Sequence, residues 1–596
     1  MKRTKRTVSE HATKRVDALP RPVYGVAPTA DDPTVKDALL DWSKDAPTYP
    51  PPTIEVGIQP PLHRPLKVYA IDSSRGKLPG NIITLMVKYE KLKPGPIGER
   101  ICVVDYDGSR ECFYDPVDLD DPLIAIQGGV EPSESDPHFH QQMVYAIASE
   151  TLRRFESALG RTIRNRSTSG TTPLRMLIYP HARREANAFA QRNSLVFGYF
   201  RARASATGRI APGQTVFTCL MHDVVVHTTT HAILNALRPD LLENGTGDSD
   251  AFLEGFCDLS AMLAHYSHRD ALIDTIQRTG GLIYKSLLRT DGEIGAGVPQ
   301  IQADLMPNNP FVALALGFGE ATGMAGGLRT VLPDPDASAL DKVREPHQRG
   351  QILLGAVFDA FFSIYVRRSQ ALFRIYRSGG GRSDSPDLPP PLAESLADEA
   401  SRVATRVFNT CVRALDYCPT GCMYFGDYLR ACITADYACD PTDKFGVRDS
   451  FMQGFRQRGI TPKGASFFTE GALRWPKVDA NPFKSLRPHF VGLPEPDASQ
   501  QEQNQEALRD FIRVNASALS LRRNIPFDVY PLEAIRWTTL DDTPQLVLAA
   551  QVSQVTRSRK RSSLDNEAKG DESRSFAGVT LVFDSSGALR HAIRTS

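Results

Sequence analysis

The stretch from Asp223 to Asp258 constrains this chain most, because it sets potential metal ligands at helical spacing. His227 and His231 stand four residues apart in an apolar run, so a helix would present both imidazoles on one face. After a polar, glycine-containing loop, Glu254 and Asp258 repeat that spacing in a second helical pattern. Two histidines and a carboxylate make a three-ligand zinc site with one position left for water. Asp258, one turn beyond Glu254, is expected to hold a ligand histidine through its other ring nitrogen.

This stretch resembles the gluzincin zinc peptidases of the thermolysin type, whose HExxH motif is followed by a glutamate ligand from a second helix. Here His231 and Glu254 are 23 residues apart. The resemblance implies an α+β, two-lobed metallopeptidase fold, with a β-rich N-terminal lobe, a helical C-terminal lobe and one catalytic-type zinc ion between them. Asp223 matches an acidic residue that binds calcium in thermolysin. Since its partner carboxylates are not recognisable, no calcium is predicted and Asp223 is expected to cap its helix.

The departure from the family lies at Thr228. The family has its general-base glutamate there, whereas this motif reads HTTTH. A threonine hydroxyl is too weak a base to take a proton from the attacking water and pass it to the leaving amine. A general acid–base group contributes roughly 10²–10⁴-fold in rate, or about 3–5 kcal/mol of barrier. The sequence therefore predicts a zinc site with impaired peptide hydrolysis.

Further positions match the family in order along the chain. Asn187, Ala188 and Phe189 resemble the edge-strand segment that hydrogen-bonds the substrate backbone, a form of β-augmentation. Arg329 resembles the arginine that binds a substrate carbonyl; the alternative is an ordinary surface arginine. His347 resembles the histidine of a loop leading into a long helix, which stabilises the oxyanion. The alternative for His347 is a helix-capping residue.

Two other groups of potential ligands are expected to be structural. His138 and His140 stand at the start of a helical pattern over 139–159, where a histidine pair more often serves packing. Cys418 and Cys422 have no second pair at zinc-ribbon spacing. No second metal is predicted from either group.

Composition limits the partners. The chain has 596 residues and a net charge of +1, which argues against nucleic-acid binding. No run of about 18 apolar residues is present, so no membrane helix is predicted. The basic N-terminus is not followed by the apolar segment of a secretion signal, and a cytoplasmic protein is expected. The expected partner is a peptide or protein in the cleft between the lobes; the oligomeric state stays open.

The pattern along the chain divides it into four parts. Residues 1–60, rich in Pro, Thr, Asp and Lys, are predicted to form a disordered arm. Residues 61–460 form the gluzincin-like region, with a β-rich lobe over 61–220 and a helical lobe over 221–460. Residues 461–495 are a linker. Residues 496–596 form a small α+β domain, in which a polar loop over 556–575 separates two strands.

Three functions remain open from sequence. The first is a zinc-binding, gluzincin-fold pseudoenzyme that serves as a binding or regulatory module, which Thr228 favours. The second is a working zinc metallopeptidase with a base from elsewhere, or an altered form of an active HETTH parent. The third is a metal-free scaffold in which the histidines are merely packed. A glutamate restored at position 228 would discriminate between the first two.

Overall fold

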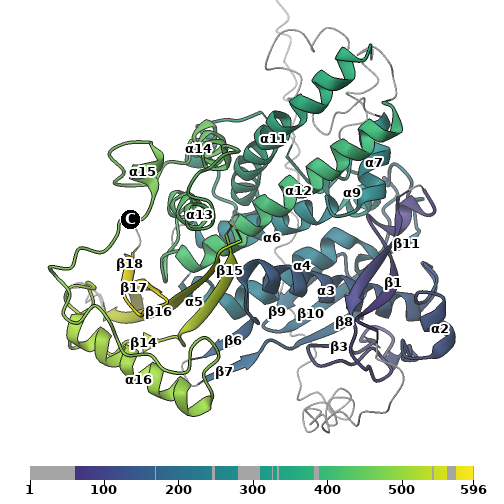
Figure 1. The fold of residues 1–596 in the computed structure, drawn as a ribbon. Coiled ribbons are helices and arrows are strands. Elements are labelled where there is room, and N and C mark those ends of the chain that lie inside the picture. Colours follow the sequence, from purple (N-terminus) through teal and green to yellow (C-terminus); the bar gives the residue numbers. More distant parts are fainter. Residues whose placement is uncertain are drawn as a thin grey trace, which may run out of the picture. The chain divides into compact units, whose positions relative to one another are not determined.

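The computed structural model describes residues 61–594, except 79, 168–169, 245–247, 279–308, 325, 332–333, 381–387, 540–541 and 560–571. The described residues belong to one compact unit that combines helices and strands (Figure 1), so the α+β class is confirmed. The predicted arm over 1–60 lies outside the described residues.

A five-stranded sheet underlies the first part of the chain. Its order is β11-β10-β8-β3, and β9 pairs the same edge of β10 as β11 does. The strands β3, β8 and β10 run parallel, while β9 and β11 are antiparallel to β10. Their bounds are Ile101–Val103 for β3, Met176–Arg183 for β8, Ala188–Gln191 for β9, Ser194–Arg201 for β10 and Thr215–Phe217 for β11. Because β10 is almost continuously apolar and buried, it forms the centre of this sheet.

Smaller elements surround this sheet. The strands β1 (His63–Tyr69) and β2 (Ile82–Lys88) form an antiparallel pair. The remaining short elements are a 3-10 turn at Ser73–Arg75, β4 (Tyr106–Asp107), β5 (Cys112–Phe113), α2 (Pro122–Ile126), β6 (Arg164–Ser167), β7 (Gly170–Pro173) and a 3-10 turn at Thr218–Leu220.

Helix α3 (Pro137–Leu159) links the sheet to the helical part of the chain. The Asp136 side chain accepts a hydrogen bond from the backbone N–H of His138, and Pro137 occupies the first helical position. The helix ends at Gly160, whose φ of 66° is left-handed. Most of α3 is buried, and it contacts β1, β2, β3, β8 and α4. It is therefore the core helix beneath the candidate site.

Three helices carry the candidate ligands: α4 (His222–Leu237), α6 (Ser249–His265) and α11 (Pro346–Ser378). Helix α6 packs against α4 on one side and α11 on the other. Two glycines allow the close crossing of α6 and α11: a Cβ on Gly255 would lie 2.6 Å from the Gly350 carbonyl oxygen. The backbones thus approach more closely than larger side chains would permit.

The other elements of this part are short strands and helices that enclose α6 and α11. They are α5 (Pro239–Asn244), α7 (Arg269–Arg278), β12 (Ala313–Leu314), α9 (Leu316–Thr322), β13 (Arg329–Thr330), α10 (Ala339–Lys342), α12 (Pro390–Ala414), a 3-10 turn at Leu415–Tyr417, α13 (Phe425–Cys439), α14 (Val447–Gln457) and α15 (Glu470–Leu473).

One helix in the described part of the chain is long and apolar enough to cross a membrane, the segment Pro346–Tyr376 of α11. Its most apolar window is 72% buried, as in the core helix of a globular protein. The apolar character of this helix is therefore accounted for by packing against α6, α12 and α14.

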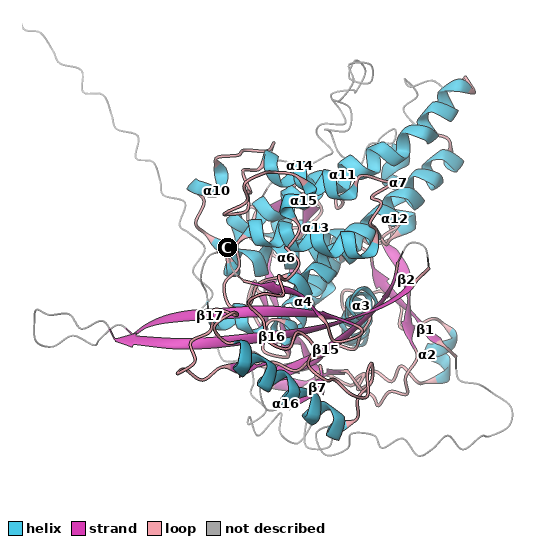
Figure 2. Cartoon of the chain, turned by 60° about the vertical axis from the view of Figure 1, so that its left-hand side comes forward, coloured by secondary structure: helices cyan, strands magenta, loops and turns pink. Residues whose placement is uncertain are grey.

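The last part of the chain packs α16 (Ala498–Asn515) on a second five-stranded antiparallel sheet. Its order is β14-β16-β17-β18, with β15 also on β16. Figure 2 shows the long hairpin of β16 and β17 above α16. A capping box between Asp497 and Gln500 begins α16. The strand bounds are Asp528–Val529 for β14, Glu533–Thr538 for β15, Pro544–Arg559 for β16, Glu572–Asp584 for β17 and Leu589–Ile593 for β18.

The polar loop predicted over 556–575 is shorter than expected. Antiparallel pairing of β16 with β17 continues to Arg559 and Glu572. The hydrogen bonds between paired strands are made by the main chain and do not require apolar side chains. A polar composition alone therefore does not end a strand. The hairpin tip, residues 560–571, lies outside the described residues.

The prediction that Asp223 caps its helix is wrong. Helix α4 begins at His222, and its N-cap residue, Met221, makes no side-chain cap. Asp223 lies in the first turn, where its Oδ2 accepts a hydrogen bond of 2.5 Å from the Ala315 N–H. Its Oδ1 accepts a hydrogen bond from the Val224 N–H at 2.8 Å. Asp223 therefore binds one amide of the first turn from inside the helix and also joins α4 to the start of α9.

Buried histidines gather at the start of α4. His222 Nδ1 donates to the Tyr69 carbonyl oxygen at 2.9 Å, and the ring contacts that of His268. Burial and the neighbouring His265 lower the pKa of His222 to about 4, although the Tyr69 carbonyl and Asp223 favour its charged form. Burial also lowers the pKa of His268 well below its ordinary value. These rings are therefore neutral in the folded protein at pH 7.

Acid should destabilise the fold through this cluster. The folded-state pKa of His222 lies below the unfolded value of about 6.5, so only the unfolded chain gains a proton between pH 6.5 and 4. Each such histidine lowers the free energy of unfolding by about 1.4 kcal/mol per pH unit in that window, or roughly 3 kcal/mol in total for His222. Urea unfolding at pH 7, 6 and 5 measures this slope.

The matched variant is His222→Asn, which keeps a donor for the Tyr69 carbonyl but does not titrate. Its unfolding free energy should fall less steeply with decreasing pH than that of the parent. Parallel slopes for the two proteins would contradict the assignment of acid sensitivity to His222.

Candidate metal centre

The structure brings together the three predicted ligands, His227 and His231 on α4 and Glu254 on α6. One ligand atom from each lies within 4.8 Å of the others. The two Nε2 atoms are 3.1 Å apart, and Glu254 Oε2 is 3.6 Å from each. Their side chains are 17%, 19% and 20% exposed, so the cluster is open to solvent on one side. Two imidazoles and a carboxylate in this arrangement suit a first-row transition metal.

Asp258 supports the cluster from behind. Its Oδ1 accepts a hydrogen bond from His227 Nδ1 at 2.8 Å and another from Arg329 Nη1 at 3.0 Å. With its proton on Nδ1, His227 turns the Nε2 lone pair toward His231 and Glu254. Hydrogen bonding of a ligand histidine to a carboxylate fixes its tautomer and makes it a better metal ligand. Asp258 is 1% exposed, so Arg329 supplies the charge that it needs in the interior.

Glu254 directs one carboxylate oxygen, Oε2, at the imidazoles of the cluster. Among the described residues, its buried Oε2 has no hydrogen-bond partner, although it faces three imidazoles. Burial opposes its ionisation, but the histidines His231, His227 and His347 hold its pKa well below the ordinary range. A buried carboxylate oxygen without a donor is costly. A metal cation between these side chains would satisfy it.

Thr228 is sealed in the helix. Its hydroxyl donates to the Val224 carbonyl oxygen at 2.8 Å, and the residue is 1% exposed. Thr229 and Thr230 donate in the same way to carbonyls four residues earlier. This back-bonding satisfies threonine hydroxyls in a buried helix. The hydroxyl of Thr228 is therefore engaged and does not act as a base.

His347 reaches the cluster from the first turn of α11, not from a preceding loop, because the helix begins at Pro346. Its Nε2 is 3.3 Å from Glu254 Oε2, and its Nδ1 is 2.8 Å from Glu345 Oε1. The close crossing at Gly255 and Gly350 places His347 beside Glu254. Glu345 is not among the residues predicted from the sequence, although it stands two residues before the histidine.

The predicted substrate-binding segment lies beside α4. Strand β9 begins at Ala188 and contains Phe189, whereas Asn187 precedes it and its carbonyl accepts the N–H of Gly198. β9 packs on α4 and pairs only with β10 in the described part of the sheet. The described strands place no partner on the other edge of β9. Arg329, by contrast, reaches the site through Asp258.

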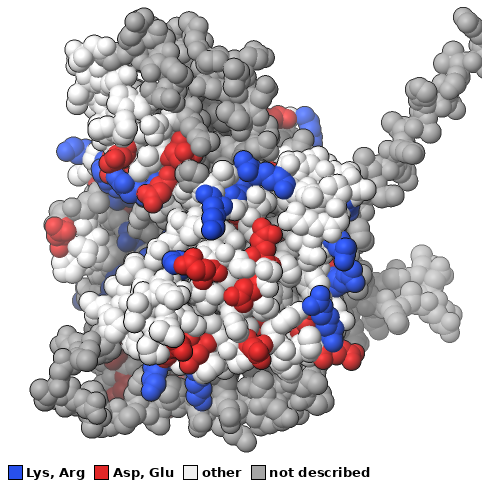
Figure 3. Space-filling view, turned by 90° about the vertical axis from the view of Figure 1, so that its right-hand side faces the viewer, with Lys and Arg blue, Asp and Glu red and all other residues white. Residues whose placement is uncertain are grey.

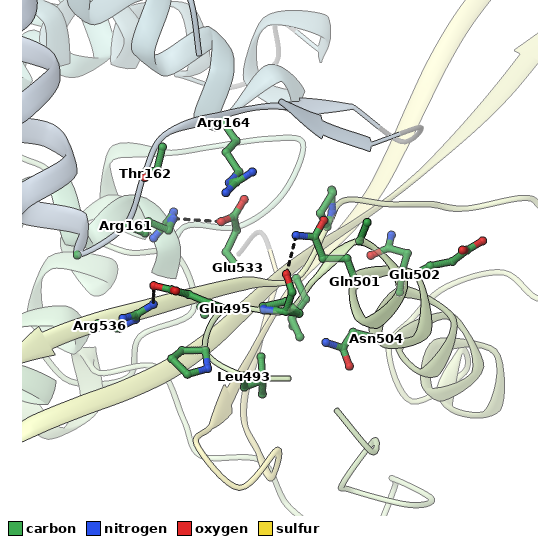
Figure 4. Close-up of a pocket in the computed structure, with 18 of the residues that line it drawn as sticks. Arg161, Thr162, Arg164, Leu493, Glu495, Gln501, Glu502, Asn504, Glu533 and Arg536 are labelled. Carbon is green, nitrogen blue, oxygen red and sulfur yellow. Dashed lines mark hydrogen bonds and ion pairs between the residues drawn. The ribbon is translucent and has the colours of Figure 1, made fainter. Parts of the chain in front are cut away.

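A large cavity lies away from these residues, where the last part of the chain meets the end of α3 (Figure 4). Its volume is about 950 Å³. Its walls carry paired charges, including Arg161 with Glu533 at 3.4 Å and Arg536 with Glu495 at 2.5 Å. Because these groups neutralise one another and no ligand set converges there, we place the candidate site at the histidines.

The surface gives no sign of a uniform charge on the face in Figure 3. There, basic and acidic side chains are interspersed among neutral ones. This agrees with the net charge of +1 for the whole chain.

Neither a known protein family nor a curated protein matches the chain. The assignment of a site therefore depends on its residues and their geometry.

Replacement of Asp258 by asparagine should weaken metal binding. Asparagine cannot accept the His227 proton with a charged oxygen, and it leaves Arg329 without its anion. We expect the affinity for Co²⁺, measured by isothermal titration calorimetry, to fall roughly 10- to 100-fold. Asp250→Asn is the matched control, because Asp250 is an exposed residue of the same helix. Equal affinities for the two variants would contradict the role given to Asp258.

Proposed function

We propose that this chain is a zinc-binding protein of the thermolysin-like gluzincin fold whose peptide hydrolysis is absent or strongly impaired. Two observations together carry the proposal. The ligand atoms of His227, His231 and Glu254 lie close together, and the buried hydroxyl of Thr228 is hydrogen-bonded to a carbonyl of its own helix. A ligand set without a general base can still bind a metal ion and a peptide, but it hydrolyses the peptide slowly or not at all. The chain then serves as a binding or regulatory module.

The fold supports the proposal in general terms. A sheet with an edge strand, β9, lies against the helix that carries both histidines, and a second helix brings the carboxylate (Figure 1). In this proposal, the predicted β-rich lobe over 61–220 and the predicted helical lobe over 221–460 would meet at this helix. We place the peptide-binding cleft there, with one zinc ion at its base.

The donor set fits zinc. Two histidine nitrogens and one glutamate oxygen are the ligands of many catalytic zinc sites, and the orphaned Oε2 of Glu254 is the anion that such an ion requires. When bound, zinc lowers the pKa of a coordinated water and polarises a substrate carbonyl. His227, His231 and Glu254 would hold it, and Asp258 would orient His227.

The remaining residues would bind a peptide and stabilise charge. The open edge of β9 offers main-chain hydrogen bonds to an extended segment. His347 is 44% exposed, and its Nδ1 is hydrogen-bonded to Glu345. When its ring also carries a proton on Nε2, it would donate that proton to a carbonyl oxygen in a hydrogen bond. Proton transfer to the leaving amine has no group at position 228 to perform it.

The second candidate is a working hydrolase that takes its base from elsewhere. The Glu345–His347 pair favours it, since a carboxylate on Nδ1 makes an imidazole a better proton acceptor and this one lies 3.3 Å from Glu254. A metal-free scaffold is the third possibility, and metal analysis separates it from the other two. Cytoplasmic location and the absence of nucleic-acid and membrane partners stay predictions.

Removal of His227 should remove one metal ion. Elemental analysis of purified protein after addition of zinc should find about one zinc ion fewer per chain in His227→Ala than in the parent. His138→Ala is the matched control, because that side chain is 44% exposed and outside the cluster. An unchanged zinc content in His227→Ala would contradict the proposed site.

Restoration of glutamate at position 228 should raise peptide hydrolysis roughly 10²- to 10⁴-fold, the range that a general base contributes. In the control Thr228→Gln, glutamine has nearly the same shape as glutamate but cannot act as a base. The control should therefore hydrolyse peptides at the rate of the parent. The assay is cleavage of casein and of a peptide library by zinc-loaded proteins. If the parent already cleaves as fast as Thr228→Glu, the base comes from elsewhere and the second candidate is right.

A further inference from the structure

A second group of ligand-type side chains lies outside the first. It consists of His140 on α3, His181 on β8 and Cys219 in the 3-10 turn before α4, and one ligand atom from each lies within 4.8 Å of the others. Their exposed fractions are 1%, 2% and 0%. Three elements far apart in sequence thus bring two imidazoles and a thiol together inside the core.

A carboxylate supports this group as Asp258 supports the first. His181 Nδ1 lies 2.6 Å from Asp105 Oδ1, and Asp105 Oδ2 accepts a hydrogen bond from the Gln141 side chain. The proton on His181 therefore sits on Nδ1, which leaves Nε2 as a lone pair directed at His140. In this form His181 is a ligand whose orientation is already fixed.

His140 is not fully satisfied by the hydrogen bonds of the protein. Its Nδ1 lies 2.7 Å from His181 Nε2 and must carry the proton between them. Its Nε2 is then a buried lone pair, and it has no hydrogen-bond partner among the described residues. Burial and the neighbouring His181 lower the pKa of His140 to about 3, although the backbone of Glu134 and Ser133 beside the ring favours its charged form. The opposite tautomer, with Nε2–H toward that backbone and the Nδ1 lone pair toward His181, would satisfy both sides if a cation lay between the rings.

We propose that His140, His181 and Cys219 form a second, buried metal site for a thiophilic ion of the zinc or copper(I) class. Imidazole nitrogens and a thiolate together select such ions over magnesium or calcium. Because all three ligands are buried, an ion here would be shielded from bulk water and would not act in hydrolysis. This inference goes beyond the proposed function and stands whether or not that function is right.

The geometry requires only small side-chain movements. Two nitrogens bound to one tetrahedral ion at about 2.05 Å lie roughly 3.3 Å apart, so the imidazoles must part by about half an ångström. The hydrogen bond between His140 and His181 holds the ligands together without an ion. Binding of one Zn²⁺ releases one proton, from the Cys219 thiol, while the His140 proton moves from Nδ1 to Nε2.

The site would brace the first one. Cys219 stands two residues before the N-cap of α4, the helix that carries His227 and His231. Its neighbour Thr218 hydrogen-bonds the Gly198 carbonyl, and the Asn187 carbonyl accepts from the same hydroxyl. An ion here would therefore tie α3 and β8 to the start of α4 and to the edge strand.

Cobalt(II) distinguishes the two sites, because the first offers no sulfur. In His227→Ala protein loaded with Co²⁺, we expect a thiolate-to-cobalt charge-transfer absorption in the near ultraviolet. Cys219→Ala in the same background should abolish it. Cys257→Ala is the matched control, since Cys257 is an equally buried thiol on α6, and it should keep the absorption.

Two results would overturn the proposal. One is the absence of this absorption in the folded His227→Ala protein, which needs no substitution in the second group. The other is an absorption that persists in Cys219→Ala. Elemental analysis adds a count: the zinc-loaded parent should hold about two ions per chain, and Cys219→Ala and His227→Ala about one each. Loss of the ion only in His227→Ala would leave the first site standing and refute the second.

Discussion

The packing of α6 between α4 and α11 is the contact on which the candidate site depends. The four-residue spacing of His227 and His231 aligns two imidazoles on one helix, but Glu254 reaches them only because α6 crosses α4. His347 reaches Glu254 only because Gly255 and Gly350 let the backbones of α6 and α11 approach closely. A larger side chain at either glycine would push His347 out of range.

Hydrogen bonds and charges then orient the packed side chains as metal ligands. Asp258 holds the proton of His227 on the ring nitrogen that faces away from the cluster, and Arg329 neutralises Asp258. Glu254 keeps a carboxylate oxygen without a donor among the imidazoles. At position 228, a glutamate would add a third carboxylate to Glu254 and Asp258, which is costly without a cation. Thr228 is instead satisfied by its own helix, so this site tolerates the metal-free state better than one with a base.

The ligands on α4 and α6 could be predicted from the sequence, because His227 with His231 and Glu254 with Asp258 stand four residues apart. Such a spacing within one helix is local information. The same holds for α3, which follows the helical pattern predicted over 139–159. Sequence periodicity did not reach the Asp105–His181–His140 chain or the approach of Cys219, because no spacing along the sequence encodes contacts among three separate elements. Arg329, predicted to bind a substrate carbonyl, pairs with Asp258, because a buried carboxylate is stabilised by a cation. Asp223 is engaged by the backbone N–H of Ala315, a contact between distant segments that no local spacing encodes.

The most direct test of the account is a crystal of the zinc-loaded chain measured on both sides of the zinc absorption edge. The account predicts an anomalous difference peak bounded by His227 Nε2, His231 Nε2 and Glu254 Oε2, with Asp258 on the far nitrogen of His227. The absence of an anomalous peak at that point, with a water molecule or no atom between the three side chains, would contradict it. The chain would then hold its histidines for packing, and the proposed zinc chemistry would fall.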